Sequence, residues 1–292
     1  MTPAFSVILV NYNAGNELYR SLQSVVDELH GVPWEGVVVD NNSTDRSADV
    51  ALEFAPNFSL IRNNENIGFS RGVNQGLAAT LAPLVLILNP DCRLMAGAIA
   101  ELKFALEEYP GCAITGPKIL NPDGSVQGTA RGDPNMWTGL FGRTTFLRRV
   151  LPWLPVSKRN VVTASTNRSN QPSVMVDWIS GACMLARRDA LAAVGGFDER
   201  YFLYWEDADL CRRLRATGDH VRYVQGATAI HRVGQSNRNA RADVVRAFHA
   251  SAFLYYSTHV ASKPFDLKRL LARVILKVRC FLVLIRQRFR RT

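Results

Sequence analysis

The stretch Ser6–Asn13 reads SVILVNYN, and it is the starting point for predicting the fold. Its central residues 7–10 form a continuous aliphatic, mostly β-branched run, which is typical of a strand buried on both faces. Similar runs occur at 36–39 and 83–88, whereas 17–29 carries apolar residues at helical spacing. This alternation predicts an α/β fold: a Rossmann-like, mostly parallel central sheet with helices on both faces.

Polar side chains follow three of these predicted strands. Asn11 follows the first run, Asp40 the second, and Asn89-Pro90-Asp91 the third. In open α/β sheets, ligands bind outside the carboxyl ends of the strands. The sequence therefore predicts that three strands deliver polar groups to one ligand-binding edge.

The remaining elements are expected from periodicity, caps and turn residues. Helices are predicted at 43–54, 72–79, 96–108 and 207–216, and strands at 59–62, 112–116, 174–185, 221–224 and 228–230. Ser43 or Asp45 is the expected cap of the first of these helices. Residues 121–172 mix Gly, Pro, Asn and Ser with scattered aromatic residues, which indicates a long insertion.

Length and composition narrow the class of protein. A chain of 292 residues that is 47% hydrophobic can form one large domain with an appendage. The five cysteines are scattered without a CxxC pair, so we expect neither a disulfide framework nor a zinc site. This use of cysteine fits a protein of the reducing cytosol. We find neither a signal-peptide pattern nor an uncharged apolar stretch long enough to span a bilayer.

The net charge of +10 is concentrated at the C-terminus, since ten basic residues and one acidic residue occur from Lys263 onward, a net +9. Residues 266–291 place apolar side chains at helical spacing between these basic residues. That pattern is typical of an interfacial helix on anionic lipid. The alternative is a helix packed on the body of the protein or in a homodimer. Aromatic residues do not interleave with the basic ones as a nucleic-acid stacking platform requires, so we expect no nucleic-acid partner.

Three acidic motifs are candidates for chemistry. Asp40 ends a strand, where a carboxylate can accept hydrogen bonds from a base or a ribose, or simply cap a turn. Asp91 stands beside a proline-fixed turn and suits a divalent cation, with a structural turn as the alternative. Glu206, Asp207 and Asp209 crowd one helix start, which could complement the helix dipole or raise a carboxyl pKa toward that of a general base.

Two further features are weaker signals. His231 follows a predicted strand and is either a ligand or a structural histidine. Residues 66–72, with Asn66, Gly68 and Arg71, offer backbone N–H groups and a guanidinium at a helix start, which suits phosphate. Neither GxGxxG nor GxxxxGK[ST] occurs, so a dinucleotide or P-loop site is not supported.

Taken in order, eight motifs resemble the family 2 glycosyltransferases of the GT-A fold, in particular their bacterial rhamnosyltransferase-like branch. The motifs are SVILVNYN at 6–13, VDNNSTD at 39–45, NIGF at 66–69, LNPD at 88–91, SGAC at 180–183, GGFDE at 195–199, EDADL at 206–210, and His231. Where many members have Asp-x-Asp, this chain has Asn89-Pro90-Asp91, a form that the rhamnosyltransferase-like branch shares.

The resemblance implies a role for each matching position. Asp207 is the implied catalytic base, and Asp91 with His231 would hold a divalent cation, Mg²⁺ or Mn²⁺. The implied nucleotide-sugar-binding residues are Asn11, Tyr12, Asn13, Asp40, Asn66, Gly68, Arg71, Asn89 and Asp91. The implied acceptor and supporting residues are Trp178, Gly181, Ala182, Glu206, Asp209 and Arg213, with 178–183 expected as a strand.

The resemblance also implies an inverting hexosyltransferase. It would move a sugar, expected to be L-rhamnose from dTDP-L-rhamnose, to a glycan or polyprenyl-diphosphate-linked acceptor in cell-surface polysaccharide synthesis, at the inner face of the membrane. A UDP- or GDP-sugar donor is the alternative within the class, and an inactive nucleotide-sugar-binding scaffold is the alternative outside it. The expected domains are 1–235 (nucleotide-sugar half 1–116, insertion 117–173, acceptor half 174–235) and a helical basic extension at 236–292.

Overall fold

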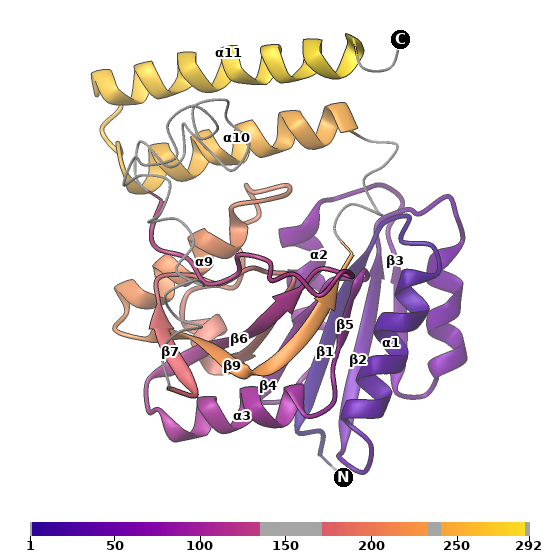
Figure 1. Ribbon diagram of the computed structural model, residues 1–292. Helices are drawn as coiled ribbons and strands as arrows, with labels where there is room; N and C mark the ends of the chain where they lie inside the picture. The colour runs from indigo at the N-terminus through magenta and orange to yellow at the C-terminus, as the bar shows by residue number, and fades with distance from the viewer. Residues whose placement is uncertain (1, 135–170, 233–240, 290–292) are drawn as a thin grey trace.

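The computed structural model describes residues 2–134, 171–232 and 241–289. Within these residues, nine strands form one sheet in the order β3-β2-β1-β4-β8-β6-β9-β5, with β7 paired to β9 (Figure 1). Six of these nine strands run in one direction, since β1 to β4, β6 and β9 are parallel and β5, β7 and β8 oppose them. The predicted mostly parallel sheet is therefore confirmed.

The elements have the following bounds. The strands are β1 (Phe5–Asn11), β2 (Trp34–Asp40), β3 (Phe58–Arg62), β4 (Leu84–Leu88), β5 (Cys92–Leu94), β6 (Cys112–Leu120), β7 (Ser173–Val176), β8 (Cys183–Arg187) and β9 (His220–His231). The helices are α1 (Glu17–Glu28), the 3₁₀ helix η1 (Ser47–Phe54), α2 (Phe69–Ala78), α3 (Ala98–Glu108), α8 (Arg188–Ala193), α9 (Glu206–Ala216), α10 (Arg241–His259) and α11 (Leu267–Phe289).

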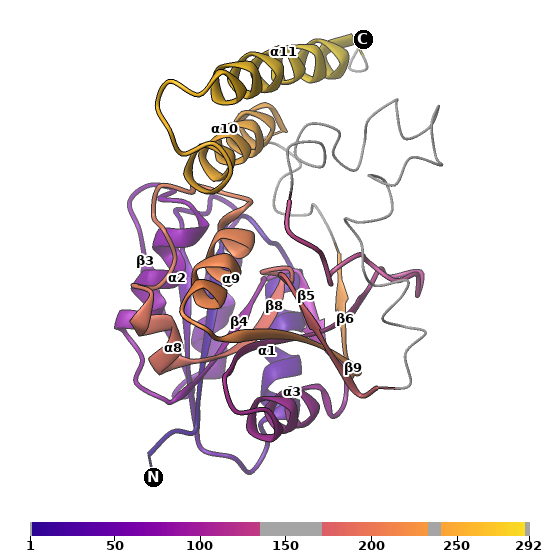
Figure 2. The same cartoon turned by 90° about the vertical axis from the view of Figure 1, so that its left-hand side faces the viewer.

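The sheet is buried between two helical layers (Figures 1 and 2). Successive residues of β1 point to opposite faces: Leu9 joins a core with α1, η1 and α3, and Ile8 joins a core with α2, α8 and α9. Every residue of β1 is buried, which explains why its sequence is a continuous apolar run. Helices on both faces, as predicted, leave the carboxyl ends of β1, β2 and β4 as the accessible edge.

Three sequence predictions need correction. The helix expected at 43–54 is a 3₁₀ helix that begins only at Ser47: the Ser43 hydroxyl donates to Asp40, whereas Asp45, the other expected cap, accepts the backbone N–H of Ser47 at 2.9 Å. The strand expected at 174–185 is two strands, since β7 pairs with β9 while β8 pairs with β4 and β6. The predicted strands 221–224 and 228–230 are one strand, β9, whose pairing with β6 shifts register after Pro117, which has no N–H to donate.

Some elements were not predicted. The three-residue strand β5 and the six-residue helix α8 are too short to show a period. Helix α10 lies within the helical extension predicted at 236–292, but its low amphipathicity gives no helical spacing from which its bounds could be predicted. β6 continues through Leu120, into the segment expected to be an insertion. Residues 135–170 of that segment lie outside the described residues.

The helices α10 and α11 pack side by side above the sheet, with α11 outermost in both views (Figures 1 and 2). Tyr256 of α10 and Ala272 of α11 belong to one small buried cluster, and Leu276 is buried one turn further along α11. The predicted helix at the C-terminus is therefore present, and one of its faces packs on α10. None of the helices within the described residues is both long and apolar enough to cross a membrane.

Candidate active site

A pocket opens at the carboxyl ends of the parallel strands, where the sequence predicts the ligand. It is lined by Val10, Tyr12, Asn41, Asn66, Gly68, Phe69, Asn89, Pro90, Asp91, Phe202, Leu203, Tyr204 and His231. Six predicted site residues are in this set: Tyr12, Asn66, Gly68, Asn89, Asp91 and His231. The structure thus brings together residues from the N-terminal strands, the 202–204 loop and the end of β9.

Asp40 and Asn11 lie behind the pocket wall, not in it. Asn11 is fully buried and donates from Nδ2 to Asp40 Oδ1 at 2.9 Å, and the Ser43 backbone N–H donates to Asp40 Oδ2 at 3.2 Å. The Oδ1 atom of Asn13 accepts the Thr44 backbone N–H at 2.8 Å. These contacts fix the loop that follows β2, so the two asparagines and Asp40 shape the wall from behind.

Asn41 is a pocket residue that the sequence prediction did not single out. Its Nδ2 donates to the backbone oxygen of Gly68 at 3.0 Å and to Asn66 Oδ1 at 3.3 Å. Gly68 has φ +87°, and a Cβ there would lie 2.6 Å from the backbone oxygen of Phe202. Only glycine fits this position, where the 66–69 turn meets the 202–204 loop. The sequence signal that could have identified Asn41 is its position directly after Asp40, at the end of a predicted strand.

Asp91 and His231, 140 residues apart in sequence, form one corner of the pocket. The pairing of β5 with β9 sets Cys92 opposite His231, which leaves Asp91 Oδ1 3.1 Å from His231 Nε2. Asp91 is 8% exposed. The backbone N–H of Arg232 donates to the backbone oxygen of Asp91 at 2.9 Å, which fixes the turn.

Gln127, which no motif singled out, sets the hydrogen-bonding state of His231. Its Nε2 donates to the His231 backbone oxygen and to Asn121 Oδ1, both at 2.8 Å, so its Oε1 must be the atom that faces His231 Nδ1 at 3.2 Å. An oxygen there requires a proton on Nδ1, and this assignment follows from the hydrogen-bond network. In the neutral imidazole, Nε2 then presents a lone pair to the carboxylate of Asp91.

A lone pair and a carboxylate oxygen 3.1 Å apart are favourable only with a proton or a cation between them. One imidazole nitrogen and one carboxylate oxygen, with Nδ1–H held by an amide oxygen, form a donor set that suits a divalent cation. The residues present therefore fit the metal that the resemblance implies. Phosphate oxygens and water would supply the other ligands.

Asp207 lies at the start of α9, on the other side of the Asn89 turn. Its Oδ2 accepts the Gly181 N–H at 3.0 Å, and the backbone oxygen of the next residue, Ala182, accepts the Asn89 N–H at 2.9 Å. A Cβ on Gly181 would lie 3.4 Å from Asp207 Cβ, an ordinary van der Waals contact, so Gly181 and Asp207 are direct neighbours. Asp207 is therefore linked to the pocket residue Asn89 through Gly181 and Ala182, although Asp207 is not itself one of the lining residues.

Burial raises the pKa of Asp207, an effect that the Gly181 hydrogen bond and the charge of Arg131 oppose. Its neighbour Glu206 is buried, and its Oε2 has no hydrogen-bond partner among the residues that the structure describes. Burial, and then the charge of Asp207, raise the pKa of Glu206 well above its usual range. A carboxyl group whose pKa is raised toward working pH can accept a proton and release it, as a general base must.

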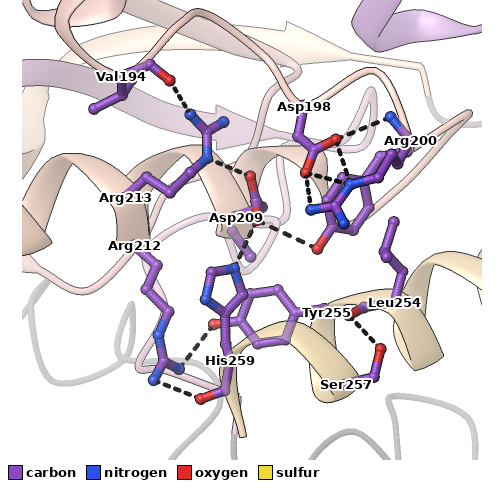
Figure 3. A network of polar contacts seen from close by, with 12 residues as sticks. Val194, Asp198, Arg200, Asp209, Arg212, Arg213, Leu254, Tyr255, Ser257 and His259 are labelled. Atoms are coloured by element: carbon purple, nitrogen blue, oxygen red, sulfur yellow. Dashed lines mark hydrogen bonds and ion pairs between the residues drawn. The ribbon is translucent and has the colours of Figure 1, made fainter. Parts of the chain in front are cut away.

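The structure leaves three predicted residues away from the pocket. Arg71 is exposed on α2 and pairs with Glu199 at 3.6 Å. Asp209 is buried against Arg213, with Nε to Oδ2 at 2.7 Å, and Arg213 also donates to the Val194 backbone oxygen (Figure 3). Asp209 and Arg213 therefore hold α9 in place. Arg71 lies outside the set of residues that line the pocket.

Of the residues expected as a strand at 178–183, residues 178–182 lie instead in the loop between β7 and β8, and only Cys183 belongs to a strand, β8. Trp178 donates from Nε1 to the Gly132 backbone oxygen at 3.0 Å, and the guanidinium of Arg131 lies 4.7 Å above its ring. Contacts with the 131–132 segment thus draw this loop out of the sheet, to the side of Asp207 where an acceptor was predicted.

Comparison with known proteins identifies the family. The model for glycosyl transferase family 2 matches residues 6–194, more than half of the chain. The chain belongs to glycosyltransferase family 2. The protein is therefore a glycosyltransferase, and an inverting one as its family is, which confirms the class expected from the eight motifs.

Relatives and solved structures agree with the assignment to family 2. The N-acetylglucosaminyl-diphospho-decaprenol L-rhamnosyltransferase of Mycobacterium tuberculosis is 33% identical over 267 residues, 87% of this chain and 84% of its own. The O-antigen chain rhamnosyltransferase WbaN of Salmonella anatum is 25% identical over 264 residues, 86% of this chain and 72% of its own.

Two solved structures share the fold at lower identity. GalNAc-T7 with UDP, GalNAc and Mn²⁺ has a TM-score of 0.62 and 17% identity, over 94% of this chain and 54% of its own. The mannosyltransferase PcManGT of Pyrobaculum calidifontis, with GDP-Man and Mn²⁺, has a TM-score of 0.58 and 14% identity, over 97% of this chain and 70% of its own. The GT-A fold is thereby confirmed, and both of these neighbours were crystallised with a divalent cation.

Proposed function

We propose that this family 2 transferase moves L-rhamnose from dTDP-L-rhamnose to a polyprenyl-diphosphate-linked sugar or glycan in cell-surface polysaccharide synthesis. The observation that carries the reaction type is the placement of Asp207 across the Asn89 turn from the Asp91–His231 pair. The relatives from M. tuberculosis and S. anatum, both named as rhamnosyltransferases, support the sugar. The lipid-linked acceptor named for the first of them supports the acceptor class.

The proposed mechanism is a single displacement. Asp207 removes the proton from the acceptor hydroxyl while that oxygen attacks the anomeric carbon from the side opposite the leaving nucleotide, which inverts the centre. Tyr12 and Asn41 line the part of the pocket assigned to the nucleoside, and Asn66 and Gly68 the part nearer the diphosphate. A bound Mg²⁺ or Mn²⁺, held by Asp91 and His231, would neutralise the charge that develops on the diphosphate.

The polar groups behind the pocket wall act by orientation. Asp40, with three hydrogen bonds from Asn11 and Ser43, holds the loop that presents Asn41 and Tyr12. Arg71 is not among the pocket-lining residues and pairs with Glu199 on the surface, which supports leaving-group stabilisation by Asp91 and His231 with a bound cation and not by Arg71. Gly181, which donates its N–H to Asp207, and its neighbour Ala182 are assigned to the acceptor side of the site, next to the Trp178 loop.

The outer face of α11 is proposed to contact an anionic membrane. Its exposed apolar side chains Leu267, Leu270, Leu271, Val274, Val278, Phe281 and Leu282 lie on the side of the helix opposite the buried Ala272 and Leu276. Basic residues, among them Lys268, Lys277 and Arg286, flank this stripe. An apolar stripe with basic borders complements an anionic lipid surface better than it complements an identical basic copy.

The proposal is tested by transfer to a synthetic polyprenyl-diphosphate acceptor, with the product measured by mass spectrometry. Separate reactions contain dTDP-L-rhamnose, a UDP-sugar or a GDP-sugar, each with Mg²⁺, with Mn²⁺, or with EDTA. We expect transfer from dTDP-L-rhamnose that EDTA abolishes. Transfer only from a UDP- or GDP-sugar would reassign the donor, and donor hydrolysis or binding without any transfer would favour the scaffold alternative.

A further inference from the structure

Helix α10 contacts residues 203–205, the loop between the pocket and helix α9. Near its middle, the hydroxyl of Ser251 donates to the backbone oxygen of Leu203 at 3.0 Å. The ring of Phe248 packs at 5.8 Å from Tyr204 and 6.0 Å from Trp205. Leu203 and Tyr204 are pocket residues, so α10 lies directly behind one wall of the pocket.

The C-terminal end of α10 contacts α9 directly (Figure 3). His259 Nε2 lies 2.6 Å from Asp209 Oδ1, a carboxylate that is 1% exposed. The same carboxylate accepts from Arg213 Nε at 2.7 Å and from the Tyr201 hydroxyl at 3.3 Å. Arg212, one turn along α9, donates to the His259 backbone oxygen at 3.1 Å. Asp207 therefore sits between two anchors, the Ser251 contact before it and the His259 contact after it.

The backbone between these anchors is strained. Tyr204 and Trp205 have φ of +68° and +72°, two consecutive non-glycine residues in the left-handed region. Such a conformation persists only where the surrounding structure over-determines it. Here Phe248 and Tyr255 of α10 hold the Trp205 ring, with Tyr255 at 5.3 Å. The contacts that enforce the turn come largely from α10, beyond the residues that the family model matches.

We propose that α10 is a functional part of the active site, and that His259 is a positioning residue that acts through Asp209. The α10 contacts hold the Tyr204–Trp205 turn, which directs Tyr204 toward the donor pocket and Asp207 toward Gly181. The inference rests on the proposed function in one respect, that Asp207 is the base. The proposal gives helix α10 a role in positioning catalytic residues, in addition to any contact of α11 with lipid.

The test uses the full chain with His259→Leu, His259→Gln and Ser251→Ala. His259→Leu removes the contact to Asp209, whereas the amide of Gln can still donate to it. The matched control is Asp243→Asn, which breaks an exposed ion pair with Arg246 on the same helix. For each protein, kcat, the KM for donor, Tm, and hydrogen exchange of the 202–210 peptide and of the β1–β4 peptides are measured.

We expect His259→Leu to lower kcat at least tenfold and to speed hydrogen exchange at 202–210 without a change at β1–β4. His259→Gln should recover most of this loss, and Asp243→Asn should behave as the wild type. Ser251→Ala, which removes one hydroxyl and leaves the fold, should raise the donor KM at least threefold through Leu203. If His259→Leu destabilises the whole protein, as a lower Tm would show, the inference is tested by Ser251→Ala instead. A donor KM in Ser251→Ala equal to that of Asp243→Asn would then overturn it.

Two other results would overturn the inference. One is wild-type kcat and exchange in a folded His259→Leu protein, and the other is a loss in His259→Leu that Gln does not recover at all. Failure of the proposed function looks different, because Asp207→Asn would then turn over normally while local exchange at 202–210 still depended on His259.

Discussion

Gln127 Oε1 lies 3.2 Å from Nδ1 of His231, on the side of the ring that faces away from Asp91. The two acceptors of the Gln127 amide nitrogen fix its orientation, so the glutamine determines which imidazole nitrogen carries the proton. Gln127, from the segment after β6, thus leaves Nε2 of His231 as the nitrogen that can bind the proposed cation together with Asp91. In metal sites, such outer partners orient the ligand and raise its basicity.

Replacement of Gln127 by Leu should weaken Mn²⁺ binding by about 10–100-fold, the usual effect of losing such a partner. Gln127→Glu retains an oxygen for the Nδ1–H and should bind Mn²⁺ nearly as well as the wild type. Titration of Mn²⁺ alone, followed by electron paramagnetic resonance, measures this without turnover. Equal affinity in the Leu variant and the wild type would contradict the role of Gln127.

Asp207→Asn should lower kcat by about 10²–10⁴-fold, the range typical of a general base. The amide can still accept the Gly181 N–H, so the loop and the donor pocket should keep their geometry. Donor affinity, measured by calorimetry with the nucleotide diphosphate and Mn²⁺, should stay within twofold of the wild-type value. Near-normal turnover would remove Asp207 from the mechanism.

Glu206→Gln should stabilise the protein at alkaline pH. Burial raises the pKa of Glu206 in the folded state, so the folded protein binds this proton more tightly than the unfolded chain does. Stability is then lost as pH rises from the unfolded pKa through the raised folded pKa. The Gln variant lacks this loss, and we expect its Tm at pH 8 to exceed the wild-type Tm by about 2–4 °C, the shift for 1 kcal/mol in a domain of this size.

The measurement that checks this is a series of thermal melts between about pH 5 and pH 8. The difference in Tm between Glu206→Gln and the wild type should grow with pH. A difference that is constant, or that shrinks as pH rises, would show that Glu206 is ionised in the folded protein at all these values.

The sequence predicted the strand ends better than the contacts between them. Asn11, Asp40 and Asp91 were placed at one edge because buried runs and the α/β pattern are local signals. The pairing of Asp91 with His231 was implied only by the family resemblance, because it depends on β5, a strand of three residues that is too short to be recognised from its own sequence. Gln127 was missed for a related reason, since its role depends on a partner 104 residues away.

Neighbouring residues can also have different roles that sequence does not distinguish. Three acids at the start of α9 point in different directions, because successive residues on a helix differ by about 100°. Within the described ranges, Glu206 is buried with no hydrogen-bond partner for its Oε2, Asp207 contacts Gly181, and Asp209 contacts His259 on α10. Arg71 was predicted to bind phosphate from its place near Gly68, and in the structure its Nε lies 3.6 Å from Glu199 Oε2 in an exposed ion pair that no sequence motif indicates.

The exposed stripe of α11 should determine binding to anionic vesicles. The triple variant Leu270→Ser, Val274→Ser and Phe281→Ser removes three side chains that are 51–63% exposed, while the buried Ala272 and Leu276 still hold α11 on α10. We expect flotation with phosphatidylserine vesicles to fall at least tenfold, since burial of each large apolar side chain is worth about 1.5–3 kcal/mol. Leu81→Ser, at an exposed leucine before β4, is the matched control and should float normally.

Salt separates the two parts of this interaction. The basic flank contributes about 1 kcal/mol per Lys or Arg near the surface, and that contribution falls off within a Debye length. Raising the ionic strength from about 0.1 M to 1 M shortens that length from about 10 Å to 3 Å, so wild-type flotation should weaken but persist through the apolar stripe. If the triple variant floats like the wild type but changes from dimer to monomer by light scattering, the stripe is instead a contact between two copies of the chain.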